Sequence, residues 1–229
     1  MTLSSHEIPS GAADPAPGPT EWEGVTPPAG VGPMPWPWPD DPRLDPDLLA
    51  AGDRRNVIDR YRYWRHEAIV ADLDSRRHPF HVAIENFAHD MNIGTVVRTA
   101  NAFLAREVHI VGHRRWNKRG AMVTDRYQHL RHHDGTAALL SFAHDAALPV
   151  IAVDNLPGAV PIETAVFPRE CLLAFGSESR GITDELRDGA ALTVSIAQFG
   201  STRSINVAVA AGVAMHTWVR QHADLTRAE

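Results

Sequence analysis

The sequence contains little cysteine and no long apolar run, and each shortage excludes a class of protein. Cys171 is the one cysteine among 229 residues, which excludes an intrachain disulfide framework and a cysteine-rich zinc site. The longest apolar run, residues 207–215, is far shorter than the roughly 20 residues that span a bilayer. The N-terminus also lacks the basic and then apolar pattern of a signal peptide. We therefore expect a protein of the reducing cytoplasm.

Several familiar site motifs are missing as well. No G-x-G-x-x-G follows the first predicted strand, and Gly112 is followed by HRRWNKRG, which is not a phosphate-binding P-loop. The residues around Ser177 do not have the spacing of a nucleophile elbow. His129, His132 and His133 lie close in sequence, but they have no cysteine or H-E-x-x-H partner, and neighbours on a strand point to opposite faces. We therefore expect no dehydrogenase, P-loop NTPase or serine hydrolase, and no metal site.

The formal net charge of −6 is unevenly distributed along the chain. Residues 1–53 hold nine acidic residues and one basic residue, whereas residues 54–133 hold 15 basic and 8 acidic residues. All but one of the 22 basic residues are arginines, which bind phosphate with two hydrogen bonds at once. An arginine bias can also reflect the base composition of a genome. The basic central block therefore leaves phosphate binding open.

The chain divides into an N-terminal arm and one larger domain. Residues 1–46 carry 12 of the 17 prolines, several of them interleaved with Trp36 and Trp38, which predicts an extended or disordered arm over residues 1–53. The Pro-Trp stretch suits either docking to a partner or packing across the domain. Residues 54–229 then form the domain, with a lead-in of helical spacing before its first strand.

The domain alternates between short apolar runs and helical patterns. Buried strands are predicted at residues 81–86, 107–112, 149–155, 171–176 and 191–197. Helices are predicted at residues 92–104, 135–146, 183–188 and 204–221. This alternation predicts an α/β fold, a mostly parallel sheet with helices on both faces.

Three polar segments follow strands, where an α/β sheet binds its ligand. They are residues 86–103, 174–183 and 195–212. Taken singly, each also suits a helix cap or a tight turn. In this order they resemble the three motifs of the SpoU/TrmH branch of the SPOUT methyltransferases. The matching residues are Asn92, Gly94, Arg98 and Ala100 in the first, Gly176, Glu178 and Gly181 in the second, and Ser204, Asn206 and Ala210 in the third.

The resemblance implies a fold, a cofactor and an activity. It implies a deep trefoil knot in the C-terminal part, a homodimer, and methyl transfer from S-adenosylmethionine to a ribose 2′-hydroxyl of tRNA or rRNA. It places adenosine against Gly176, Ile196 and Ile205, with Ser204 and Asn206 nearby. Catalytic or bracing roles fall to Arg98, Asn92, Glu178, Ser204 and Asn206. Because a guanidinium group stays protonated, Arg98 suits polarisation of the hydroxyl and the adjacent phosphate better than proton removal.

Two departures from the family pattern concern the third motif. The sequence has Ile196, Ala197 and Gln198 where Ile-Pro-Met is frequent, and Ile205 where Leu is usual. Losing the proline makes this loop less rigid. Two other functions stay open: a non-catalytic RNA-binding member of the fold, and a SPOUT enzyme that methylates a base. The apolar last helix predicts a dimer interface together with part of the 92–104 helix.

Overall fold

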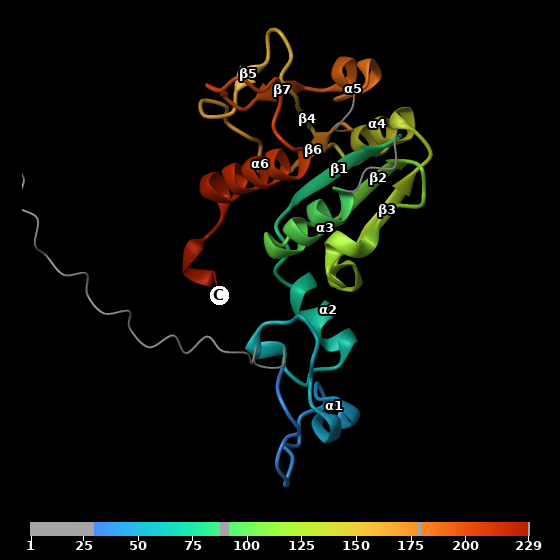
Figure 1. Ribbon diagram of the computed structural model, residues 1–229, viewed down its shortest axis with the longest axis vertical. Helices are drawn as coiled ribbons and strands as arrows, with labels where there is room; N and C mark the ends of the chain where they lie inside the picture. Colours follow the sequence, from blue (N-terminus) through green and yellow to red (C-terminus); the bar gives the residue numbers. More distant parts are fainter. Residues whose placement is uncertain (1–29, 88–91, 178–179, 229) are drawn as a thin grey trace, which may run out of the picture.

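The computed structural model describes residues 30–87, 92–177 and 180–228 (Figure 1). Its centre is a sheet of seven strands in the order β3-β2-β1-β6-β4-β7-β5, and every neighbouring pair is parallel. The strands are β1 (Phe80–Asn86), β2 (Val108–Gly112), β3 (Leu130–His133), β4 (Val150–Val153), β5 (Val160–Pro161), β6 (Cys171–Phe175) and β7 (Leu192–Ser195). Because all of them run the same way, their carboxyl ends meet at one edge.

Helices cover both faces of this sheet. They are α3 (Ile93–Ala102) and α6 (Val207–His222) on one face, and α4 (Thr136–Asp145) and α5 (Asp184–Gly189) on the other. Successive side chains of β1 point to opposite faces of the sheet and so contribute to both layers. Val82 and Ile84 pack in the cluster with α3 and α6, whereas Ala83 packs in the cluster with α4 and α5. Within the described ranges, no helix combines the length and the hydropathy that crossing a bilayer requires.

The five predicted strands and four predicted helices are all confirmed, to within a few residues at each end. β3 and β5 were not among the predicted buried strands. Both lie at the edges of the sheet, and most of their side chains are exposed or polar. Edge strands of this kind lack the continuous apolar run that marks a buried parallel strand.

Residues 30–76 form a unit of their own before β1, which we call the N-terminal unit. It contains α1 (Pro46–Ala51), the short 3₁₀ helix η1 (Asp59–Tyr61) and α2 (His66–Asp74). Tyr61, Trp64, Ile69 and Leu73 are buried together, in one cluster with Tyr127 of the domain. A cavity of about 820 Å³ separates part of this cluster from the C-terminal turn around Leu225.

The expected boundary between residues 53 and 54 runs through the N-terminal unit and is corrected here. Asp53 is fully buried, its carboxylate accepts hydrogen bonds from Arg55 and from the backbone of Tyr63, and its backbone pairs with Val31. The described part of the expected arm is therefore folded onto the residues after it. Residues 1–29 lie outside the described residues.

Candidate functional site

The first and third motifs meet at the carboxyl edge of the sheet. Asn92 is the N-terminal cap position of α3, and Asn206 caps α6. The side-chain amide of Asn206 donates to the side-chain oxygen of Asn92 at 2.9 Å. Its own oxygen accepts from the backbone nitrogens of Ala208 and Val209 at the start of α6. One residue thus ends the loop after β7, starts α6 and joins it to α3.

The second motif forms a tight loop after β6. Ser177 and Gly181 pair through their backbones at 2.8 and 3.1 Å, and Gly176 is buried against that pair. A Cβ at position 176 would lie 1.9 Å from the carbonyl carbon of Gly181, so a side chain there collides with the loop itself. The sequence alone suggested that Gly176 leaves room for adenosine, but the loop provides a sufficient reason for this glycine. Glu178 lies outside the described residues.

Asp154, directly after β4, holds the second loop in place. Its carboxylate accepts from the backbone nitrogen of Ile182 at 2.8 Å and lies where a Cβ of Gly181 would stand. Gly181 has a φ of +69°, a conformation that favours glycine. Sequence reasoning did not single out Asp154. Its only local signal is an acidic residue at the end of an apolar strand.

The third loop carries the two departures from the family pattern. Ile196 is partly buried and packs against the core, whereas Ser204 is exposed. The backbone nitrogen of Ala197 donates to Glu163 at 3.2 Å, so Glu163 holds the backbone of this loop at Ala197. The side-chain oxygen of Gln198 is buried without a hydrogen-bond donor among the residues that the structure describes.

Arg98 stands apart from the Asn92–Asn206 contact. It is exposed on α3, six residues after Asn92, which corresponds to about 9 Å along the helix axis. The next residue, Thr99, faces α6, since its Cγ2 would lie 3.9 Å from a Cβ added to Gly212. In the described part of the chain, the guanidinium group has no ion pair, so it is available to a group outside this chain.

Two polar residues at the end of β1 support the site. Sequence reasoning included Asn86 only as the first residue of a polar segment and did not single out Glu85. Glu85 is buried and accepts hydrogen bonds from the hydroxyls of Thr136 and Thr183, at the starts of α4 and α5. Asn86 is buried and donates to the backbone oxygens of His113 and Arg115 at 2.6 and 3.0 Å. Polar residues ending an apolar run were the available signal.

The loop that Asn86 holds is strongly basic. Its cationic side chains are exposed, and they are Arg114, Arg115, Lys118 and Arg119. The loop packs closely on the start of α3. A Cβ added to Gly94 would lie only 2.9 Å from the backbone oxygen of Asn117. The positive charge predicted for the central block therefore borders the first motif.

Comparison with known proteins identifies this arrangement. Residues 79–216 match the model of the SpoU rRNA Methylase family. The chain belongs to this family. It is 31% identical to an uncharacterized tRNA/rRNA methyltransferase of Mycolicibacterium vanbaalenii over 79% of this chain and 60% of the relative. It is 25% identical to the tRNA (guanosine(18)-2′-O)-methyltransferase of Escherichia coli over 67% of this chain and 69% of the relative.

A solved structure supports the same assignment. The SpoU methyltransferase AviRb from Streptomyces viridochromogenes, in complex with the cofactor AdoMet, superposes with a TM-score of 0.57 at 25% identity. The match covers 66% of this chain and 63% of AviRb. The chain spans about 60% of the length of the Mycolicibacterium vanbaalenii relative. Membership in the SpoU family thus rests on the region from β1 to α6.

Proposed function

We propose that this SpoU family member is an RNA methyltransferase that moves a methyl group from S-adenosylmethionine to a ribose 2′-hydroxyl of tRNA or rRNA. The hydrogen bond between Asn206 and Asn92 carries the proposal, because it joins two of the three family motifs at one edge of the sheet. A relative supports it, since the Escherichia coli protein to which the chain is similar is a tRNA 2′-O-methyltransferase. The cytoplasm, expected from the sequence, is the proposed location.

The residues of the third loop fit the cofactor. The buried oxygen of Gln198 has no donor within residues 30–87, 92–177 and 180–228, and it can accept a hydrogen bond from a group such as an amino group. Loop backbone near Gly176, Ile196 and Ile205 would supply the remaining polar groups. When bound, S-adenosylmethionine supplies an electrophilic methyl group carried on a sulfonium.

The protein's part in the reaction is to position the two reactants. Asn206 and Ser204 would orient the cofactor side, and Asn92 holds Asn206 in place. Arg98 would donate hydrogen bonds to the ribose hydroxyl and the neighbouring phosphate, which aligns the attacking oxygen. Glu178 keeps the bracing role that the family resemblance implies.

RNA would approach over the basic loop. Exposed arginines bind phosphates and release counterions, so binding there falls steeply with salt. Arg114→Gln together with Arg115→Gln should weaken RNA binding and reduce the slope of log affinity against log salt by about 2, one unit for each arginine that no longer neutralises a phosphate. Cofactor binding should stay unchanged.

A homodimer would complete the site. Val209 and Val213 are 56% and 37% exposed on α6, beside α3, although most apolar neighbours on that helix are buried. A second copy covers such a stripe most simply, as the family resemblance implies. Light scattering should give the mass of two chains for the parent and of one chain for Val213→Glu.

A deep knot in the C-terminal part is also proposed. It is supported by the strand order β6-β4-β7 and by the hydrogen bond from Asn155, after β4, to the backbone oxygen of Arg203, before α6.

A methyl-transfer assay tests the central proposal. Labelled S-adenosylmethionine is incubated with total tRNA and rRNA, and nuclease digestion separates 2′-O-methylnucleosides from methylated bases. Arg98→Ala should lower the rate about a hundredfold with cofactor affinity unchanged, because one charge-assisted hydrogen bond at the reacting oxygen is worth about 3 kcal/mol. Arg187→Ala on α5, on the other face of the sheet, is the matched control.

A second variant tests the contact between the motifs. Asn206→Asp keeps an oxygen that caps α6 but loses the amide that donates to Asn92. Cofactor affinity should fall by roughly threefold to tenfold, the value of one net hydrogen bond.

Two outcomes of the methyl-transfer assay would favour the alternatives. Methylated bases after nuclease digestion would point to a base methyltransferase, and tight RNA binding without cofactor binding would point to a non-catalytic protein.

A further inference from the structure

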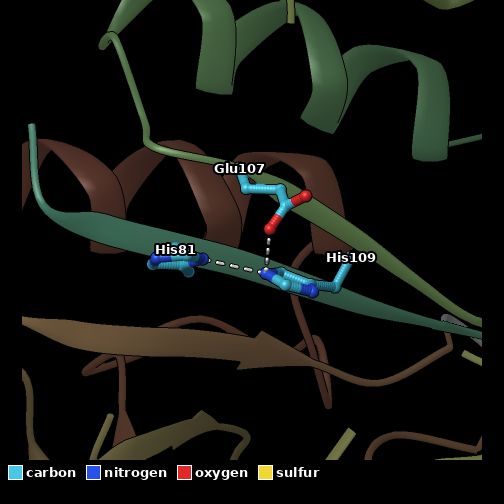
Figure 2. Close-up of side chains that lie close together, drawn as sticks. All are labelled: His81, Glu107 and His109. Carbon is cyan, nitrogen blue, oxygen red and sulfur yellow. Dashed lines mark hydrogen bonds and ion pairs between the residues drawn. The ribbon is translucent and has the colours of Figure 1, made fainter. Parts of the chain in front are cut away.

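A second group of polar side chains lies at the opposite, amino ends of the strands. His81 on β1, Glu107 directly before β2, and His109 on β2 each offer one ligand atom, and these atoms lie within 4.8 Å of one another (Figure 2). Residues two apart on a strand share a face, so Glu107 and His109 point the same way. This group is separate from the three family motifs.

The spacing of the three groups suits a transition-metal ion. His81 Nδ1 lies 2.9 Å from His109 Nε2, and a carboxylate oxygen of Glu107 lies 3.7 Å from that same nitrogen (Figure 2). Two ligands on a tetrahedral zinc ion, with bonds of about 2.0–2.1 Å, stand about 3.3 Å apart. Shifts of a few tenths of an ångström would therefore bring these two pairs to ligand spacing, whereas the third pair, His81 and Glu107, lies within 4.8 Å and has to close further.

His109 is the most deeply buried of the three candidate ligands, because its side chain is fully buried whereas His81 and Glu107 are partly exposed.

His133 of β3 occupies the other nitrogen of His109. His133 Nε2 lies 2.9 Å from His109 Nδ1. With His109 as the donor in this hydrogen bond, its lone pair lies on Nε2, which faces His81 and Glu107. A partner behind the ligand that sets its tautomer is a regular feature of histidine metal sites.

The outer side of the group opens into a cavity of about 290 Å³, lined in part by Asp74, Arg77, Arg106 and His129. Arg77 pairs with Asp74 at 2.7 Å, and Arg131 donates to both oxygens of Glu107 at 3.1 Å. Arg131 therefore competes with a cation for this carboxylate. The cavity leaves room for a water molecule beside the three ligands.

We propose that His81, Glu107 and His109 bind one divalent transition-metal ion of the zinc class, with His133 as the positioning residue and the fourth coordination position open to the cavity. Two histidines, one carboxylate and an open position form a known type of zinc site. On binding, His81 moves its proton from Nδ1 to Nε2, with no net loss of a proton. The proposal differs from the absence of metal expected from His129, His132 and His133, because the structure joins other histidines.

The test uses the full chain after treatment with a chelator. Titration with Co(II) should give the visible bands of a tetrahedral nitrogen and oxygen site, saturating at one ion per chain, and competition against a coloured chelator gives the Zn(II) affinity. Glu107→Gln and His81→Ala should each weaken Zn(II) binding more than His133→Ala, which should cost roughly 10- to 100-fold. Arg131→Gln should strengthen binding, because it frees Glu107.

His132→Ala is the matched control, since His132 also lies on β3 but bonds to the backbone oxygen of Gly112. Its affinity should equal that of the parent. Circular dichroism without metal checks that each variant folds. The proposal would be overturned if the folded parent showed no saturable metal binding. It would also be overturned if Glu107→Gln and His81→Ala bound Zn(II) as tightly as the parent does. Methyl transfer does not enter this test, so the two proposals stand or fall separately.

Discussion

The N-terminal unit and the sheet that follows it are stabilised by different interactions. In the N-terminal unit, charged groups are central: Asp53 is buried against Arg55, and Asp72 accepts from the hydroxyl of Tyr61 at 2.6 Å. In the sheet, large apolar side chains such as Trp218 and Phe175 are almost completely buried between the strands and helices. The unit should therefore respond to pH, whereas the sheet should respond mainly to a reduction in apolar volume.

The size of each core explains why the two regions differ. The sheet has two layers of helices and buries enough apolar surface to hold its strands together. The N-terminal unit has a small cluster of five buried side chains, one of them from the domain. Removing one partner of a buried ion pair leaves an unpaired charge, which costs more than removing an exposed pair.

The largest effect is expected in the sheet, for Trp218→Ala. Trp218 is fully buried against Phe80, at a centroid distance of 4.6 Å, and its indole nitrogen donates to the backbone oxygen of Arg169. The free energy of unfolding should fall by about 3–5 kcal/mol, with little dependence on pH. Urea denaturation measures it. Leu225→Ala, at a 67% exposed position, should change the stability by less than about 0.5 kcal/mol.

Gly176→Val should come next, and it separates folding from ligand binding at the carboxyl edge. The new side chain would collide with the backbone of Gly181, so the loop must open. We expect a loss of about 1–3 kcal/mol in unfolding free energy together with loss of cofactor binding by calorimetry. Gly32→Val, outside the three motifs, has open space around the new Cβ and serves as the control. If Gly176→Val loses cofactor binding at full stability, the glycine serves the cofactor directly.

Much of the fold could be predicted because its signals are local. The runs HVAIEN and CLLAFG are apolar over the length of a strand, and both form central strands. The predicted helix start at residue 92 agrees with Asn92 as the cap of α3, whereas the last helix was predicted from residue 204 and begins after its cap, Asn206. Their hydrogen bond spans 114 positions, so the contact itself follows from the sheet order, which the apolar pattern does not determine.

The remaining features depend on contacts between distant residues. The collision that explains Gly176 arises only when the chain returns at Gly181, and the meeting of His81 with His109 depends on the pairing of β1 with β2. The boundary at residue 53 failed for a similar reason. Proline content predicted an extended chain, whereas Val31 pairs with the backbone of Asp53 far along the sequence.

Asp53→Asn tests the pH response of the N-terminal unit. Burial raises the pKa of Asp53, but hydrogen bonds from Arg55 and Tyr63 outweigh burial and lower the pKa from 3.8 to about 2. A lowered carboxyl pKa gives stability that is present above about pH 4 and is lost as the pH falls toward about 2. At about pH 7 the variant should be about 2 kcal/mol less stable than the parent. Urea denaturation from about pH 7 to about pH 3 should show the difference shrinking at the acid end.

Asp134→Asn is the control for that series, because its side chain is 95% exposed. Its stability difference from the parent should be small at every pH. A difference for Asp53→Asn that stays constant down to about pH 3 would contradict the assignment. The N-terminal unit would then depend on packing, as the sheet does.

The smallest effect is expected on removing residues 1–29. This segment holds four acidic residues and no basic ones, so it repels RNA and offers no phosphate contact. A chain beginning at Gly30 should keep its stability, cofactor affinity and methyl-transfer rate, and should bind RNA slightly better at low salt. A chain beginning at Arg54 should unfold at lower urea concentration, because it lacks Asp53 and the pairing with Val31. If the two chains are equally stable, residues 30–53 do not contribute to the stability of the N-terminal unit, and the comparison with the sheet applies only to the residues after them, including α2.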